Sequence, residues 1–188
     1  MKKGWIAIVV ATIAYIGCSG IKVSQDYEPA ANFQSMSTYR WAMLNQEKTG
    51  DARMDNPLRD TRIRAAVDRI LAGKGFTKTA GDNPTFLVRY QNIMRRKIES
   101  DGGGPRVGFG VGSYGRHGGI AVGTGNSVRE YDEGTLVIDF VAPATEDLIW
   151  RGSGSQRFKE YGDPQKATRD VNLLVEKILE QFPPDSQK

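Results

Sequence analysis

The chain of 188 residues contains a single cysteine, Cys18, and a single histidine, His117. One cysteine cannot form a disulfide within the chain, so the fold must be stabilised by its hydrophobic core. The usual histidine and cysteine ligand sets for zinc are also missing. His117 lies in a glycine-rich turn that would not hold a catalytic base in a fixed position. The sequence therefore predicts no metal, no cofactor and no histidine-dependent catalytic site.

Long hydrophobic runs are also missing. The apolar run at residues 6–16 is shorter than the roughly 17–25 residues that span a membrane as a helix. Lys2 and Lys3 precede this run, and Gly17 and Cys18 follow it. A basic start, a short apolar segment and a small residue before a cleavage point are typical of a secretory signal peptide.

The end of this segment, Tyr15-Ile16-Gly17-Cys18, resembles the lipobox of bacterial lipoproteins, with Tyr15 where leucine is usual. The resemblance implies cleavage between Gly17 and Cys18, then S-diacylglycerol and N-acyl modification of Cys18. Two or three acyl chains anchor a protein stably, so the domain itself needs no membrane-binding face. By the sorting rule of such lipoproteins, Ser19 in place of aspartate favours the outer membrane, with the domain facing the periplasm.

The predicted organisation is a signal peptide at 1–17, a lipidated cysteine and tether at 18–22, one domain at 23–184 and a tail at 185–188. Removing residues 1–17 leaves 171 residues, which is enough for one hydrophobic core. The formal net charge of +4 is lower once Lys2 and Lys3 are removed with the signal peptide, because 24 basic and 22 acidic side chains then remain. This balance gives no reason to expect a nucleic-acid partner.

The remaining pattern predicts two amphipathic helices, at 58–74 and 164–182, from apolar residues at helical spacing. Strands are predicted from alternation and β-branched or aromatic residues at 23–27, 38–43, 85–98, 107–112, 120–123, 135–141 and 148–152. Because short turns join most adjacent strands, we expect an α+β fold. It has a mostly antiparallel sheet of about six strands, with both helices packed on one face.

The segment from Gly102 to Gly125 contains eleven glycines. Residues 107–112 alternate apolar residues with glycine, which predicts a strand with one bare face. The same composition also fits a mobile loop, and the sequence does not decide between the two. Gly110 to Gly115 matches the G-x-G-x-x-G string of dinucleotide-binding loops, but no helix can follow it, so this motif carries no binding prediction.

Five basic residues near this segment form a tentative interaction surface: Arg95, Arg96, Lys97, Arg106 and Arg116. Such a surface could meet lipid headgroups, lipopolysaccharide phosphates or peptidoglycan carboxylates, although a solvated strand end is the simpler interpretation. We interpret the charged residues of the 58–74 helix as its solvent-facing side. Asp139 interrupts an apolar strand, where alternation favours an outward, half-exposed position over a catalytic one.

Several segments between residues 22 and 184 carry the pattern of one family: Asp26-Tyr27, Thr38-Tyr39-Arg40-Trp41, Lys74-Gly75-Phe76, Phe86-Leu87-Val88-Arg89-Tyr90, Gly134-Thr135-Leu136-Val137-Ile138-Asp139, Trp150-Arg151-Gly152 and Phe182-Pro183-Pro184. Together they resemble the bacterial lipoprotein family catalogued as domain of unknown function 4136. The resemblance implies the fold and the anchorage, and it brings no catalytic residue and no cofactor.

We expect a membrane-anchored bacterial envelope lipoprotein without enzymatic activity, acting as a structural, assembly or interaction protein with an envelope protein partner. The exposed edges of a sheet could add a strand from such a partner. One alternative is a periplasmic ligand-binding module for an anionic or glycan component of the envelope. A carboxylate-based hydrolase that uses Asp139 is the third hypothesis, and it would require a concave pocket around Asp139.

Overall fold

The computed structural model describes residues 20–42, 49–100 and 128–184. The elements in chain order are β1 (Lys22–Tyr27), a 3-10 turn (Phe33–Ser35), β2 (Thr38–Trp41), α1 (Pro57–Gly73), β3 (Thr77–Lys78), β4 (Phe86–Ser100), β5 (Val128–Val141), β6 (Leu148–Arg157) and α2 (Pro164–Leu179). The predicted α+β class is therefore confirmed.

Both helices begin in the same way, at a capping residue followed by proline. The side chains of Asn56 and Asp163 each accept a hydrogen bond from a backbone N–H in the first turn. Pro57 and Pro164 occupy the first helical position, where the missing N–H has no cost. After α1 the chain turns at Gly75, whose positive φ of 90° suits glycine. The capping residues and prolines therefore set where both helices start, and Gly75 sets where the chain turns away from α1.

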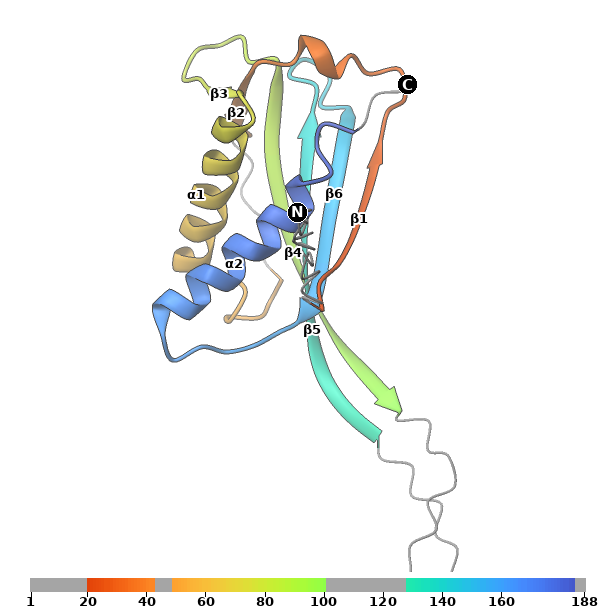
Figure 1. Ribbon diagram of the computed structural model, residues 1–188, viewed down its shortest axis with the longest axis vertical. Coiled ribbons are helices and arrows are strands. Elements are labelled where there is room, and N and C mark those ends of the chain that lie inside the picture. The colour runs from red at the N-terminus through yellow and green to blue at the C-terminus, as the bar shows by residue number, and fades with distance from the viewer. Residues whose placement is uncertain (1–19, 43–48, 101–127, 185–188) are drawn as a thin grey trace, which may run out of the picture.

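The six strands form one sheet in the order β1-β6-β5-β4-β2-β3 (Figure 1). Neighbours from β1 to β4 are antiparallel, whereas β2 runs parallel to both β4 and β3. The sheet is mixed, so the predicted mostly antiparallel arrangement is wrong. The cause is α1, which connects β2 to β3: a helical crossover returns the chain in the same direction. Strand β3 has two residues and was not predicted.

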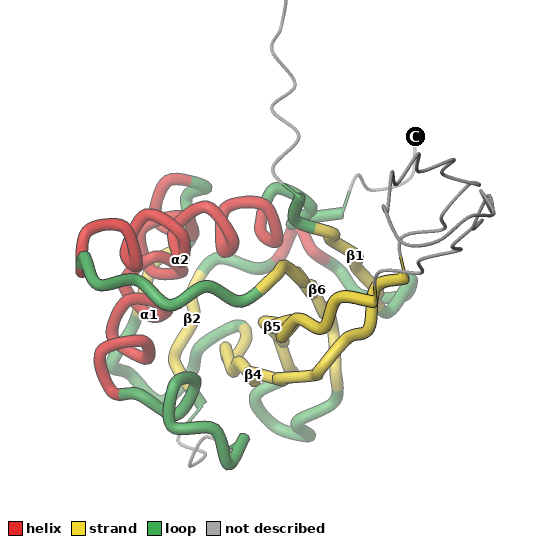
Figure 2. The backbone as a smooth tube through the Cα atoms, turned by 90° about the horizontal axis from the view of Figure 1, so that it is seen from below, coloured by secondary structure: helices red, strands yellow, loops and turns green. Residues whose placement is uncertain are grey.

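Helix α2 packs directly on the backbone of β6. A β-carbon at Gly154 would lie 2.8 Å from Leu174 Cδ1, and one at Gly152 would lie 2.6 Å from Ile178 Cγ2. Real β-carbons do not approach other atoms so closely, so two glycines in alternate positions allow the helix to sit against the strand. Residues of α1 join the same hydrophobic cluster, and α1 lies beside α2 in the end-on view (Figure 2).

Phe182, three residues after α2, lies at the centre of the core and is fully buried. Its ring lies 4.5–6.3 Å, between ring centroids, from the rings of Phe33, Phe76, Phe86, Phe140 and Trp150. These rings come from the segment after β1, the segment after α1 and three strands. Contacts at such distances add to the burial energy of each ring, so one residue links most of the fold.

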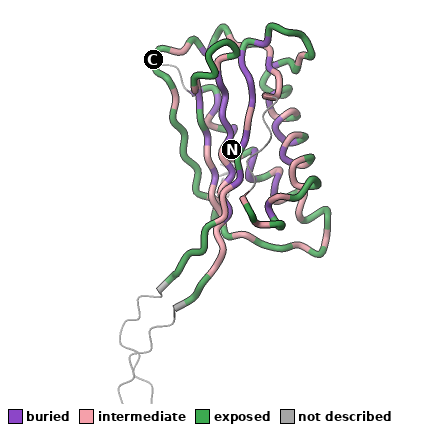
Figure 3. The backbone as a smooth tube through the Cα atoms, turned by 180° about the vertical axis from the view of Figure 1, so that it is seen from behind, coloured by how far each residue is buried: buried purple, intermediate pink, exposed green. Residues whose placement is uncertain are grey.

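Strands β4 and β5 continue as a two-stranded ribbon beyond the rest of the sheet. Their pairing extends to Ser100 and Val128, whereas β6 pairs with β5 only from Glu133 onward. The ribbon leaves the body at its lower end in Figure 1, and its outer part is exposed or half-buried (Figure 3). The predicted glycine strands at 107–112 and 120–123 lie outside the described residues. Within the described ranges, no helix is long and apolar enough to cross a membrane.

Candidate functional site

Most residues that the sequence singled out for anchorage or interaction lie outside the described ranges: Gly17, Cys18, Arg106 and Arg116. Lipidation of Cys18 and cleavage before it therefore stay predictions.

Arg95, Arg96 and Lys97 lie in β4, where the ribbon begins to extend beyond β6. They face acidic residues of β5 across the strand pair. Lys97 Nζ lies 3.2 Å from Glu133 Oε1, and Arg96 Nε lies 3.9 Å from Asp132 Oδ1. Arg95 is the register partner of Glu133. The ribbon thus carries alternating charges of both signs, and its role as an interaction surface stays a prediction.

Asp139 lies between two arginines of the neighbouring strands. Arg151 donates from Nε and Nη2 to the carboxylate at 2.7 and 2.8 Å, and Arg89 Nε donates at 3.1 Å. The carboxylate side chain is only 8% exposed, so it is more buried than the alternation suggested. Hydrogen bonds between a carboxylate and guanidinium groups are charge-assisted and are among the strong ones in proteins. This geometry is that of a structural ion pair.

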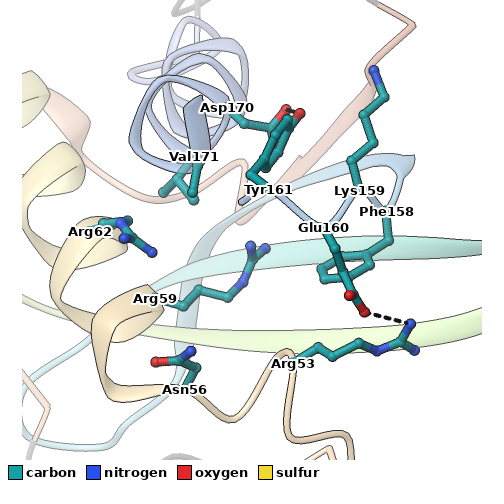
Figure 4. Close-up of a pocket in the computed structure, with 11 residues that line it drawn as sticks. Arg53, Asn56, Arg59, Arg62, Phe158, Lys159, Glu160, Tyr161, Asp170 and Val171 are labelled. Atoms are coloured by element: carbon teal, nitrogen blue, oxygen red, sulfur yellow. Dashed lines mark hydrogen bonds and ion pairs between the residues drawn. The ribbon is translucent and has the colours of Figure 1, made fainter. Parts of the chain in front are cut away.

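A pocket of about 240 Å³ lies between the start of α1, the segment after β6 and the first half of α2 (Figure 4). It is lined by Arg53, Asn56, Arg59, Arg62, Phe158, Lys159, Glu160, Tyr161, Ala167, Asp170 and Val171. Four of these residues are basic and two are acidic. None of them was predicted as a site residue.

Arg53 forms one wall of the pocket and is fixed by several carboxylates. Its guanidinium lies 2.6 Å from Asp51, 3.0 Å from Asp132 and 3.5 Å from Glu160. It also lies 5.1 Å from the ring centroid of Phe158, which adds a cation–π contact. The charge of Arg53 is therefore largely balanced within the protein.

Asp170 of α2 is bound to neutral donors. Tyr161 Oη donates to Asp170 Oδ1 at 3.0 Å, and Gln156 Nε2 donates to Oδ2 at 2.7 Å. Burial, together with the bond to Asp170, raises the pKa of the Tyr161 phenol above its ordinary value. Each carboxylate oxygen of Asp170 thus accepts one hydrogen bond from a neutral donor.

In Figure 4 the side chain of Arg59 extends from α1 into the middle of the pocket, and Arg62 lies to one side of it. The Nε of Arg59 is buried and has no hydrogen-bond partner among the described residues. Burial lowers the pKa of Arg59; Asp170 opposes this shift, and the like charge of Arg62 adds to it. Arg62 Nε donates to Thr168 Oγ1 at 3.1 Å. Neither arginine forms an ion pair within the described part of the chain.

The pocket can therefore hold a small anion. Arginine stays protonated in proteins, so Arg59 and Arg62 keep two positive charges in a partly dehydrated space. A buried donor without a partner is costly, and an oxygen acceptor from a ligand would satisfy it. Guanidinium groups match carboxylate and phosphate oxygens in geometry. The volume is below that of common small-molecule sites, which suits one anionic group of a ligand.

The described residues offer no cluster of three or more histidine, cysteine, aspartate or glutamate side chains that could hold a metal ion.

The sequence contained a signal for Arg59 that was not used. Arg59 lies four and seven residues before Ile63 and Ala66, two buried residues of α1, so it shares their face of the helix. The arginines of α1 were interpreted as its solvent-facing side, which is wrong for the half-buried Arg59 and Arg62. A charged residue in phase with an apolar stripe is the pattern that could have located the pocket.

The family model described as "Domain of unknown function (DUF4136)" matches residues 23–184. A comparison with curated proteins found no match. Among solved structures, a PDZ domain protein from Parabacteroides distasonis ATCC 8503 is similar with a TM-score of 0.49 and 11% identity, over 89% of this chain. This chain covers only 36% of that protein. PelC from Paraburkholderia phytofirmans, described as a dodecamer, has a TM-score of 0.43 and 12% identity, with 85% and 94% of the two chains covered. Similarity at this level supports no argument about function.

Proposed function

This chain belongs to the DUF4136 family, whose description names no activity, and we propose that it is an envelope lipoprotein that binds a small anionic group between α1 and α2. The lipid on Cys18 holds it at the membrane, and the protein is not an enzyme. The observation that carries the proposal is Arg59: a half-buried side chain whose Nε is buried and lacks a partner within the described residues.

Two further features support binding rather than a purely structural role for Arg59. Within the described residues, the two carboxylates that line the pocket form no hydrogen bond or ion pair with Arg59: Glu160 lies 3.5 Å from Arg53, and Asp170 accepts from Tyr161 and Gln156. In addition, burial lowers the pKa of Arg59, and the like charge of Arg62 adds a smaller shift in the same direction, while Asp170 and Tyr90 oppose it. An anion in the pocket would offset the cost of burying this charge and would accept the missing hydrogen bond.

The test is thermal unfolding of residues 20–188, which retain every residue of the hydrophobic core, with inorganic phosphate or with sodium chloride at equal ionic strength. A ligand that binds only the folded state stabilises it by RT ln(1 + [L]/Kd), or about 2.7 kcal/mol at 100 times Kd. We expect phosphate to raise the Tm of the wild-type domain. Arg59→Gln should unfold at a higher temperature than wild type without phosphate, because an unpaired buried charge is removed, and phosphate should add little.

Arg69→Gln is the matched control, since Arg69 is an exposed residue of the same helix and does not line the pocket. It should retain the phosphate response, including the general stabilisation that phosphate gives any protein. Equal responses of wild type, Arg59→Gln and Arg69→Gln would contradict the proposal.

A second candidate function is assembly with an envelope protein through the β4–β5 ribbon. The observation that favours it is the ribbon's shape: both strands continue beyond their other neighbours, and Ile98 near its end is 68% exposed. A free strand edge can accept a strand from a partner. Photo-crosslinking from position 98 in whole cells tests this candidate, with exposed position 173 of α2 as the control. A specific partner captured from position 98 alone would support it.

A further inference from the structure

The arginine pocket lies at the same end of the domain as the start of β1. Lys22, the first residue of β1, is the register partner of Ser155 in β6. Three residues beyond Ser155, Phe158 lines the pocket. In Figure 1 the start of β1, the end of β6 and the first turns of both helices all lie at the lower end of the body. The pocket and the point where the chain enters the domain therefore lie at the same end of the domain.

The tether between the proposed anchor and the domain is very short. Ile21 already packs against the hydrophobic core, so only Ser19 and Gly20 separate Cys18 from the folded domain. A chain spans at most about 3.3–3.6 Å per residue, which places Cys18 within about 11 Å of Ile21. The headgroup layer of a bilayer is itself about 5–7 Å thick on each side. A lipid on Cys18 therefore keeps this end of the domain, from which the β4–β5 ribbon also projects, close to the membrane surface.

From this geometry we infer that the anion held by Arg59 and Arg62 is the phosphate group of an anionic phospholipid in the membrane that carries the anchor. The inference rests on the proposed anion-binding function and on lipidation of Cys18. Phosphate diesters are the most concentrated anions at a membrane surface, and their oxygens suit guanidinium groups. The apolar wall of the pocket, which includes Phe158 and Val171, would lie beside the glycerol and the first carbons of the lipid.

Occupancy of the pocket would fix the orientation of the domain. A lipid anchor alone allows the domain to rotate about its tether, whereas a second contact to a headgroup holds one face against the membrane. The acylated cysteine and the arginine pocket would act together, since a weak site binds effectively when its ligand is held close by.

The test uses the full lipidated protein in a non-ionic detergent and counts bound lipid by native mass spectrometry. The added lipids are phosphatidylglycerol and, in a separate sample, phosphatidylcholine; inorganic phosphate is the competitor. We expect wild type to retain one phosphatidylglycerol and to release it at millimolar phosphate. Phosphatidylcholine carries the same phosphate diester, but its choline cation would lie near the basic residues of the pocket, so wild type should retain little of it. Arg59→Gln should reduce the retained fraction at least about tenfold, Arg62→Gln should also reduce it, and Arg69→Gln should bind as wild type does.

The outcomes separate the two proposals. If phosphate raises the Tm of the wild-type domain through Arg59 but the lipidated protein retains no phosphatidylglycerol, the lipid inference fails and the anion-binding function stands. If neither phosphate nor lipid binds, both fail. Equal loss of phosphatidylglycerol in Arg59→Gln and Arg69→Gln would mean that general surface charge holds the lipid, which overturns the inference. The Tm of each variant without ligand verifies that it is folded.

Discussion

Gly154 of β6 lies against Ile178 of α2 so closely that a β-carbon at position 154 would be 2.8 Å from Ile178 Cγ1. Ile178 is fully buried and cannot move away without disturbing the rest of the core. The contact therefore fixes the height of α2 above the sheet, and with it the upper wall of the arginine pocket. Gly152 and Gly154 give β6 a bare face of the kind that the sequence predicts at 107–112, a segment outside the described residues.

The first prediction concerns this contact. Gly154→Ala should destabilise the domain by about 1–3 kcal/mol, because overpacking forces side chains or backbone to shift. For a domain of this size, each kcal/mol lowers Tm by about 2–4 °C. Gly73→Ala is the control: nothing lies within 4 Å of a β-carbon there, and alanine favours the helix by about 0.5–1 kcal/mol. Calorimetry should give a Tm below that of wild type for Gly154→Ala and above it for Gly73→Ala. A Gly154→Ala protein as stable as wild type would refute the contact.

The second prediction concerns the ion pairs of Asp139. Asp139→Asn should destabilise the domain by about 1–3 kcal/mol, since Arg89 and Arg151 lose a carboxylate that accepts three hydrogen bonds. Glu99→Gln is the comparison, because its partner Arg157 and Glu99 itself are both about half exposed, and such pairs contribute about 0–1 kcal/mol. Urea unfolding gives both values. Equal effects of the two substitutions would mean that the burial of Asp139 does not strengthen its ion pairs.

The third prediction concerns Tyr39 at high pH. Burial, followed by the hydrogen bond to the Asp68 carboxylate, raises the pKa of the Tyr39 phenol above its ordinary value of 10. Above pH 10 the unfolded chain therefore releases this proton while the folded chain keeps it. The free energy of unfolding should fall by up to about 1.4 kcal/mol per pH unit from this group alone.

Below pH 10 the contribution of Tyr39 is fully present. Tyr39→Phe should lower stability at pH 8, since the hydrogen bond of 2.9 Å to Asp68 is lost. Above pH 10 the free energy of unfolding of this variant should fall less steeply than that of wild type. Urea unfolding of both proteins at pH 8, 10 and 11 gives the difference. A difference in free energy of unfolding between the two proteins that stays the same from pH 10 to 11 would contradict the raised pKa.

The fourth prediction concerns the anchor. Cys18→Ala should abolish incorporation of a labelled fatty acid and move the protein out of the membrane fraction, because Cys18 is the only thiol in the chain. Ser19→Ala leaves the acceptor thiol intact and should remain labelled. A Cys18→Ala protein that stays labelled and membrane-bound would contradict lipidation at this residue.

Local signals in the sequence located the helices and the long strands. The predicted helix at 58–74 differs from α1 by one residue at each end, because Pro57 and Gly75 mark its limits. The predicted strand at 135–141 is the buried part of β5. The family resemblance is confirmed by the match over residues 23–184. These features depend on spacing and turn chemistry within short segments, which a single sequence contains.

The parallel pairing of β2 and the arginine pocket depend on contacts between distant segments. β2 has only four residues, and nothing in them indicates whether the neighbouring strand is parallel. The pocket combines Arg59 with Tyr161 and Asp170, about a hundred residues later. Periodicity placed Arg59 beside an apolar stripe, but only the packing of α2 on Gly154 decides what faces it. Tertiary contacts of this kind are not encoded in local pattern.

The position of Phe182 has a consequence for when this protein can fold. The aromatic ring that joins the segments after β1 and α1 to the central strands emerges from the ribosome only after almost all the others. Until residue 182 is present, the central strands lack the ring that fills the space between them, so a chain still being synthesised cannot close its core. Helix α2 and Phe182 must therefore be synthesised before the central strands can pack in their native arrangement.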